Sequence, residues 1–187
     1  MYDNHKLGIM FQAYTNNLTC YTDRPFIIDK AQQYKYLEHV AFYGLTWADL
    51  SSIKFGFALF NKRTMGYRRA NRSDTLFMVL AQSGRVPMWG DVILNGNYTY
   101  EYALYPHIGD WKTGDVHREA NNYNFKALTY VGDPSKGTLP QRLSLLESSV
   151  KNVLVSAVYT KKGKLYVRMY EYIGESASVN LLSQISH

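Results

Sequence analysis

The sequence contains a single cysteine, few prolines and no long hydrophobic run. Cys20 is the only cysteine among 187 residues, which excludes an internal disulfide and a zinc site built from thiolates. No stretch approaches the roughly 18 apolar residues that a membrane-spanning helix needs, and the first ten residues lack the pattern of a signal peptide. We therefore expect an intracellular, cytoplasmic protein that has no contact with a membrane.

Motifs of self-contained catalysis are missing as well. The sequence has no G-x-S-x-G elbow, P-loop or dinucleotide fingerprint, and its five histidines form no i, i+4 pair. His107, Asp110 and His117 lie close together in the sequence. The proline and the glycine turn around His107 favour a structural histidine that bonds to the backbone. We therefore predict no catalytic residue, no metal ligand and no cofactor in this chain.

The composition that remains is that of a folded, basic and tyrosine-rich protein. Hydrophobic residues make up 46% and charged residues 19%, which is typical of globular domains. The 17 tyrosines favour β-strands and wet surfaces. The net charge of +6 permits attraction to nucleic acid or to an acidic surface. Because only the charge supports nucleic-acid binding, we predict no nucleic-acid partner.

Alternation of apolar and polar residues predicts strands in the second half of the chain. Residues 98–104, 153–158 and 164–170 alternate clearly. The polar connection at residues 160–163 joins the last two of these segments as a hairpin. Residues 153–158 are apolar on both faces, which predicts a central strand of a sheet.

The first half of the chain predicts a second hairpin and several short strands. Residues 55–69 are predicted to form the hairpin, and a turn at residues 71–74 leads into an apolar run that ends at Leu80. Shorter strands are expected at residues 6–11, 18–21, 34–42 and 145–147. Many short strands separated by turns are typical of an antiparallel β-sandwich.

The second hairpin is strongly basic. Five cationic side chains surround Tyr67: Lys62, Arg63, Arg68, Arg69 and Arg72. The first interpretation is a solvated hairpin whose charges discourage pairing with another strand edge. The second is an interface to an acidic partner, and the third is a nucleic-acid surface that combines phosphate contacts with a stacking ring.

One segment departs from strand periodicity. Its apolar residues have helical spacing and predict a short helix within residues 113–125 that lies against a sheet. Asp115 and Glu119 would share one face of this helix, and glycoside hydrolysis needs two carboxylates that stand close together. Asp115 is better placed to cap the helix or to interact with its dipole, so we do not assign the pair to catalysis.

Glycines and prolines at residues 132–141 mark a loop or junction. We therefore predict two parts. Residues 1–131 form a large β-sandwich portion that includes the helix, and residues 132–187 form a smaller, incomplete C-terminal β subdomain.

One tract resembles a known signature. Residues Glu101–Trp111, EYALYPHIGDW, resemble the F-x-Y-A-L-Y-P-H-x-G-D-W tract in the C-terminal β-region of the α-mannosidases of glycoside hydrolase family 38. Arg118, Glu119, Ala120 and Asn124 resemble the REA…N pattern that follows it in that family. Residues 47–50, 55–80 and 152–174 are also similar to segments of the family, in the same order. The sequence departs from the family at residue 126, where lysine stands in place of a Pro-Leu continuation.

The resemblance implies a mainly β fold, an antiparallel β-sandwich of the supersandwich-like or galactose-mutarotase-like type with one short helix. It also implies that the signature residues are structural: Tyr105, Pro106, His107, Gly109, Asp110, Trp111, Arg118 and Glu119. By resemblance, the basic hairpin residues Tyr67, Arg68 and Arg69 are candidates to face the sugar-binding cleft or a partner.

In that family a catalytic domain with the zinc ligands and an aspartate nucleophile precedes the β-region. None of its motifs occurs here, so the resemblance implies a noncatalytic C-terminal portion or subunit of an α-mannosidase. Zinc is expected only in the catalytic domain, and the expected partner is that domain or a second copy of the chain, with a mannoside as a candidate ligand. The alternative is a free-standing carbohydrate-binding module that uses Trp89, Trp111 and the tyrosines to stack on sugars.

Overall fold

The computed structural model describes residues 4–13, 17–31, 42–69, 74–86, 90–132, 137 and 140–184. The predicted strand at residues 34–42 and the predicted turn at 71–74 lie largely outside them. Contacts divide the chain into two compact units, Met1–Lys126 and Ala127–His187. The boundary predicted from the sequence lies a few residues later, between residues 131 and 132.

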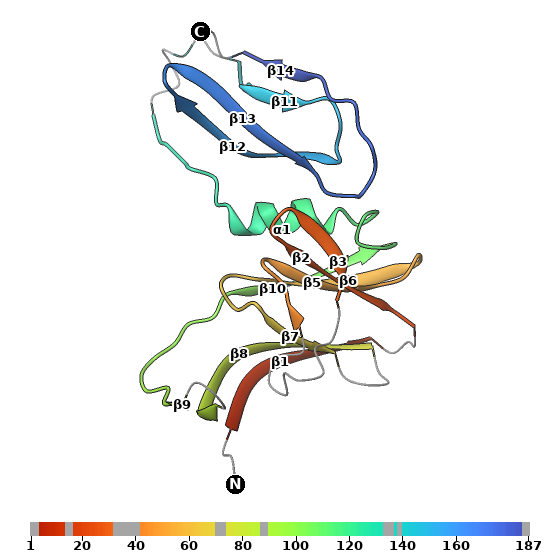
Figure 1. The fold of residues 1–187 in the computed structure, drawn as a ribbon, viewed down its shortest axis with the longest axis vertical. Helices are drawn as coiled ribbons and strands as arrows, with labels where there is room; N and C mark the ends of the chain where they lie inside the picture. The colour runs from red at the N-terminus through yellow and green to blue at the C-terminus, as the bar shows by residue number, and fades with distance from the viewer. Residues whose placement is uncertain are drawn as a thin grey trace. The chain divides into compact units, whose positions relative to one another are not determined.

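The first unit contains two five-stranded antiparallel sheets (Figure 1). The first sheet has the order β1 (Asn4–Ala13), β8 (Asp74–Val86), β7 (Gly66–Arg69) and β4 (Phe42–Tyr43), with β9 (Gly90–Val92) paired to β8. The second sheet has the order β10 (Tyr102–Ile108), β6 (Phe55–Asn61), β5 (Trp47–Ser51), β2 (Thr19–Arg24) and β3 (Ile27–Lys30). The prediction of a mainly β, antiparallel sandwich with one helix is confirmed.

The hydrophobic core of the first unit lies between these two sheets. Alternate residues of each strand point inward because successive side chains of a strand face opposite sides. Ala48 and Leu50 come from β5, Leu59 comes from β6, and Leu76 and Met78 come from β8. These side chains are completely buried, so burial of apolar area between the sheets stabilises the sandwich.

The second sheet is buried on its other face too, because the helix packs there. Helix α1 (Val116–Asn124) lies within the predicted range and contacts β5 and β6. Asp115 occupies the position before the helix with a left-handed backbone, φ 49°, but its side chain makes no capping hydrogen bond. Its carboxylate pairs instead with Arg118 at 3.2 Å. Asp115 therefore occupies the predicted N-cap position without a side-chain capping hydrogen bond, and its interaction with the helix dipole stays a prediction.

The hairpin predicted at residues 55–69 is also wrong. Strand β6 pairs with β5 and β10, whereas β7 pairs with β4 and β8. The connection between them therefore crosses from one sheet to the other. Both strands have an apolar face that needs cover, and crossing lets Tyr67 of β7 meet Leu59 of β6 across the core.

The strand predicted at residues 98–104 begins later than expected. Strand β10 starts at Tyr102, which pairs with Asn61 at the end of β6. Residues 98–101 lie outside any strand. Alternation alone cannot extend a strand beyond its partner, because the hydrogen-bond ladder then has nothing to pair with.

The second unit contains two two-stranded antiparallel sheets. The first pairs β11 (Leu146–Ser148) with β14 (Leu181–Ser183), and the second pairs β12 (Val153–Lys161) with β13 (Lys164–Glu171). Lys162 and Gly163 connect β12 and β13 with φ of 50° and 72°, the positive pair that a type I′ turn requires. The predicted hairpin is confirmed. Within the described residues β12 pairs only with β13, so the prediction that it is a central strand is wrong.

Candidate functional site

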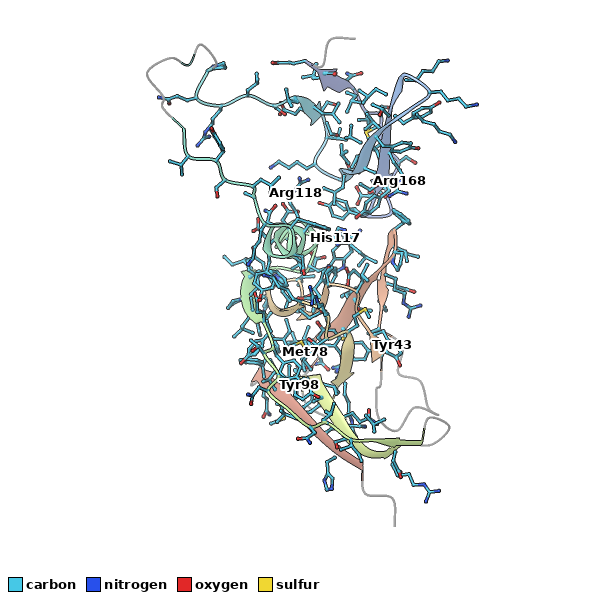
Figure 2. The ribbon with its side chains drawn as sticks, turned by 90° about the vertical axis from the view of Figure 1, so that its left-hand side faces the viewer. Tyr43, Met78, Tyr98, His117, Arg118 and Arg168 are labelled. Atoms are coloured by element: carbon cyan, nitrogen blue, oxygen red, sulfur yellow. The ribbon has the colours of Figure 1, made fainter. Side chains whose placement is uncertain are left out.

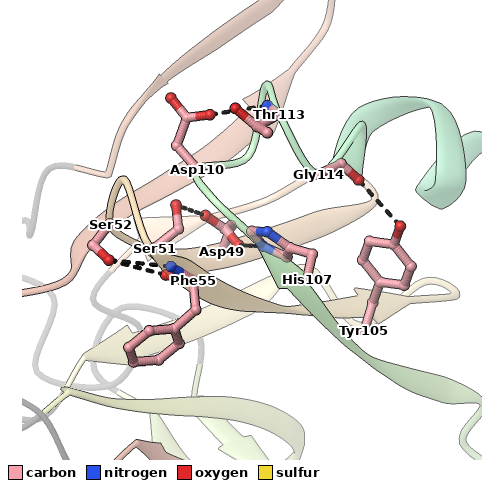
Figure 3. Close-up of polar contacts among 9 residues, drawn as sticks. All are labelled: Asp49, Ser51, Ser52, Phe55, Tyr105, His107, Asp110, Thr113 and Gly114. Carbon is pink, nitrogen blue, oxygen red and sulfur yellow. Dashed lines mark hydrogen bonds and ion pairs between the residues drawn. The ribbon is translucent and has the colours of Figure 1, made fainter.

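Most of the signature tract forms strand β10 of the second sheet, and His107 of this strand points to the face of the sheet that helix α1 covers. Side chains of β5 that point away from the core, Trp47, Asp49 and Ser51, are buried there. His107 of β10 joins them on this face, and His117 reaches it from α1 (Figures 2 and 3). Buried polar groups from three elements therefore meet under the helix, which makes this cluster the candidate site of the first unit.

Asp49 is the centre of the cluster. Its Oδ1 lies 2.8 Å from His107 Nε2, and its Oδ2 accepts a short hydrogen bond from the Ser51 hydroxyl (Figure 3). Both side chains of the Asp49–His107 pair are nearly inaccessible to solvent. Burial raises the pKa of the Asp49 carboxyl, while the hydrogen bonds from His107 and Ser51 act in the opposite direction. The sequence prediction that His107 bonds to the backbone is wrong, because its partner is this carboxylate.

This arrangement does not resemble a nucleophilic triad. The Asp49 carboxylate stands between Ser51 and His107, so the imidazole is not hydrogen-bonded to the hydroxyl that it would have to activate. His107 Nδ1 is buried and has no hydrogen-bond partner among the described atoms. What the geometry does provide is a tie between β5 and β10, strands separated by β6.

Two glycines make room for the His107 ring. A Cβ on Gly114 would lie 2.5 Å from His107 Nδ1, and a Cβ on Gly56 would lie 2.7 Å from His107 Cε1. Both distances are far below van der Waals contact, so no larger residue fits at either position without displacing the ring. The glycine after the signature tract is thus explained by close approach of the backbone to an aromatic ring.

Other signature residues support the turn that leads into the helix. The Tyr105 hydroxyl donates to the Gly114 carbonyl at 3.1 Å, and Asp110 Oδ1 accepts from the Thr113 amide at 2.9 Å (Figure 3). Gly109 has φ 73°, a conformation that glycine adopts without strain. The ring of Trp111 is buried, 6.0 Å from the ring of Trp47. Pro106 and Glu119 complete the tract, exposed on β10 and half-buried on α1 respectively.

His117 connects the helix to the sheet. The indole N–H of Trp47 donates to His117 Nδ1 at 3.0 Å, so this nitrogen must be unprotonated. Burial lowers the pKa of His117 from 6.5 to about 4, because the charged imidazolium loses its hydration there. The nearby carboxylate of Asp115 acts in the opposite direction.

The depressed pKa of His117 predicts a loss of stability in mild acid. The unfolded chain takes up a proton near pH 6.5, whereas the folded chain resists it until about pH 4. Neutral His117 therefore makes its full contribution to the free energy of unfolding above pH 6.5. This contribution, roughly 3 kcal/mol in total, is lost as the pH falls from 6.5 to 4. Urea unfolding at several pH values checks this.

The matched control is His117→Gln, whose amide oxygen can accept the indole hydrogen bond but does not titrate. Because Asp23 and Asp49 also have shifted pKa values, the quantity to compare is the difference between the two proteins. A difference that stays constant from pH 7 to pH 4 would contradict the assignment.

The structure places the three candidates of the basic hairpin in different environments. The Tyr67 side chain is completely buried, and its hydroxyl donates to the Leu59 carbonyl, so it lies in the core rather than on a cleft or partner surface. Arg69 Nη2 pairs with Asp74 at 2.9 Å. Arg68 is exposed. Whether the two arginines face a cleft or an acidic partner stays a prediction, and Arg72 lies outside the described residues.

One cavity lies at an end of the first sheet. It measures about 410 Å³ and is lined by His5, Ser83, Tyr98 and Tyr100, among others. Of the two tryptophans expected to stack on sugars, Trp111 is buried and Trp89 lies outside the described residues. No group of three metal-binding side chains occurs among the residues that the structure describes. No helix in that part of the chain is long and apolar enough to cross a membrane.

Strand β5 contributes two site residues that the sequence did not predict. Trp47 and Asp49 supply the partners of His117 and His107, yet neither was identified as a site residue. The available signal was the aspartate inside the apolar run WADL, because a buried carboxylate needs a partner.

Comparison with known proteins gives both relatives and structural neighbours. Alpha-mannosidase G of Dictyostelium discoideum is 26% identical over 149 residues, which cover 76% of this chain and 13% of that protein. Two Enterococcus faecalis structures, an alpha-mannosidase and a protein in glycosyl hydrolase family 38, align with TM-scores of 0.77 and 0.75. Each is 16% identical and matches 96% of this chain but 22% of its own.

No model of a known protein family matches the sequence. The chain spans only a small part of each protein that it resembles, in sequence and in structure alike. The matched part has the β-rich fold described above, and the resemblance found in the signature tract is confirmed. In sequence the chain is accordingly similar to a small part of α-mannosidases, and its fold is that of a β-rich part of the two Enterococcus faecalis structures, one of which is a protein in glycosyl hydrolase family 38.

Proposed function

We propose that this chain is a noncatalytic C-terminal β-portion or subunit of an α-mannosidase that acts together with a separate catalytic portion. The observation that carries the proposal is the coverage of the structural match, 96% of this chain against 22% of the Enterococcus faecalis α-mannosidase. In this proposal, zinc and the nucleophile belong to the catalytic portion, and the complex works in the cytoplasm on mannosides.

The cluster around Asp49 is consistent with this assignment. Its polar groups are engaged with one another or buried under the helix, and they hold the sheet and helix together. A rigid β-portion of this kind can position or cover the active site of a partner without supplying a reacting group.

An activity assay tests the proposal. The purified chain, with and without added Zn²⁺, is expected to release no nitrophenol from nitrophenyl α-mannoside, whereas a complete family-38 α-mannosidase does so under the same conditions. The chain should also retain no zinc after dialysis, as measured by elemental analysis. Nitrophenol release by the chain alone would overturn the proposal. The flanking coding sequence provides a second test, since a neighbouring reading frame with a family-38 catalytic domain is expected.

A free-standing carbohydrate-binding module is the second candidate, and the tyrosine-lined cavity is the observation that favours it. Its volume of about 410 Å³ falls within the range of small-molecule sites. Tyrosine rings can stack on the apolar face of a sugar while their hydroxyls bond to its polar edge. Calorimetric titration with mannose oligomers distinguishes the candidates. Binding that Tyr98→Ala abolishes would favour the module, and no heat of binding would favour the noncatalytic portion.

A further inference from the structure

The β12–β13 hairpin has fewer strand neighbours than its sequence predicts. Residues 153–158 are apolar on both faces, yet within the described residues β12 and β13 pair only with each other. Val155, Val158 and Met169 share one face of the ribbon and are exposed. Because a two-stranded ribbon is marginally stable in water, its composition points to further strands along a free edge.

The edge of β13 is better suited to pairing than that of β12. The register of β12 shifts between Val155 and Ala157, and such a bulge disturbs the ladder and bends the strand. Strand β13, Lys164–Glu171, contains no proline, no glycine and no bulge. Its outer edge therefore presents a regular row of backbone donors and acceptors to another strand.

β13 is complementary to itself in one antiparallel register. A two-fold axis perpendicular to the sheet leaves each face of β13 on the same side of the extended sheet. Because side chains alternate between the faces, two opposed residues must then both have odd numbers or both have even numbers. With Val167 on the axis, it lies opposite Val167 of the second copy, and Leu165 lies opposite Met169. Both pairs extend the apolar face of the ribbon, because Val155 and Val158 lie on that face as well.

The other face is compatible with the same register. Tyr166 lies opposite Arg168 of the second copy, a combination that allows a cation–π contact, and Lys164 lies opposite Tyr170. Neighbouring registers are worse. An axis through Tyr166 opposes Lys164 to Arg168, and an axis through Arg168 opposes that residue to itself. Like charges directly opposite each other destabilise a sheet.

We propose that this chain forms a two-fold homodimer through the edge of β13, with Val167 opposite its own copy. The two hairpins then make one four-stranded antiparallel sheet, and the contact is closed because the same edge is used by both copies. This inference is independent of the enzymatic role proposed above, and it can fail while that role stands.

Sedimentation equilibrium of the full chain tests the proposal. At concentrations from about 1 to 100 µM, the wild type is expected to reach twice the mass of one chain. Val167→Lys places two like charges opposite each other and is expected to raise the dissociation constant on the order of tenfold or more. The matched control is Val158→Lys, on the same face but on β12, which should leave the dimer intact. A wild type that stays monomeric, or a dimer that only Val158→Lys breaks, would overturn the proposal.

Cysteine cross-linking decides the register even if either lysine variant folds poorly. Opposed residues of an antiparallel pair have Cα atoms about 4.5–5.5 Å apart, within reach of a disulfide. Val167→Cys should therefore cross-link to its own copy under mild oxidation. Met169→Cys should not, because its copy lies roughly 13 Å away along the strand. The native Cys20 is buried and does not compete. Failure of Val167→Cys to cross-link would refute this register.

Discussion

Replacing Trp47 with alanine is expected to lower the free energy of unfolding of the first unit by about 3–5 kcal/mol. The side chain is completely buried between the second sheet and helix α1. Its removal leaves a large cavity and takes away the indole that His117 accepts from. Urea unfolding followed by tryptophan fluorescence measures the loss, because the remaining tryptophans, Trp89 and Trp111, also belong to this unit.

Trp47→Phe separates packing from hydrogen bonding. Phenylalanine keeps much of the buried area but cannot donate to His117, so a smaller loss of about 1–2 kcal/mol is expected. Trp47→Phe should also reduce the pH dependence of the unfolding free energy that is assigned to His117, because His117 Nδ1 no longer accepts the indole hydrogen bond and is protonated more easily. Equal losses for the alanine and phenylalanine variants would contradict a packing role for the indole.

Replacing Asp49 with leucine is expected to cost about 3 kcal/mol of the same unfolding free energy. Leucine has a similar size, but it leaves the His107 Nε2–H and the Ser51 hydroxyl buried without an acceptor. The loss of unfolding free energy arises from these two buried donors without an acceptor rather than from a change in side-chain volume. Denaturation at pH 7 measures it.

Two further variants isolate the pair. Asp49→Asn retains an oxygen that accepts from His107, so a loss of only about 1 kcal/mol is expected. The double variant Asp49→Leu/His107→Leu removes both partners and should be more stable than the sum of the single losses predicts. Strict additivity would show that the buried pair is not coupled.

The local parts of the fold were predictable from the sequence because their causes are local. Helix α1 followed from apolar residues at helical spacing, and the β12–β13 hairpin followed from two alternating segments around a lysine–glycine turn. The signature tract was recognisable for the same reason, since its residues are contiguous. The buried position of Trp111 and the turn at Gly109 lie within that short stretch.

The sheet assignments were not predictable, because strand pairing depends on distant segments. Residues 55–69 have the pattern of a hairpin, yet β6 and β7 belong to opposite sheets. The alternation at residues 98–104 continues past the point where β6 ends. In both cases the position of the strand depends on a partner strand elsewhere in the chain, and local alternation does not identify that partner.

The sequence by itself determined that the protein is β-rich, that one helix follows the signature tract, and that the chain resembles part of a family-38 α-mannosidase. Only the tertiary structure decided what the signature residues contact. Asp49 and His107 are 58 residues apart and Trp47 and His117 are 70 apart, so no local pattern links them. They meet because one face of β5 is turned toward the helix while the other fills the core, and buried polar groups on that face must find partners in each other.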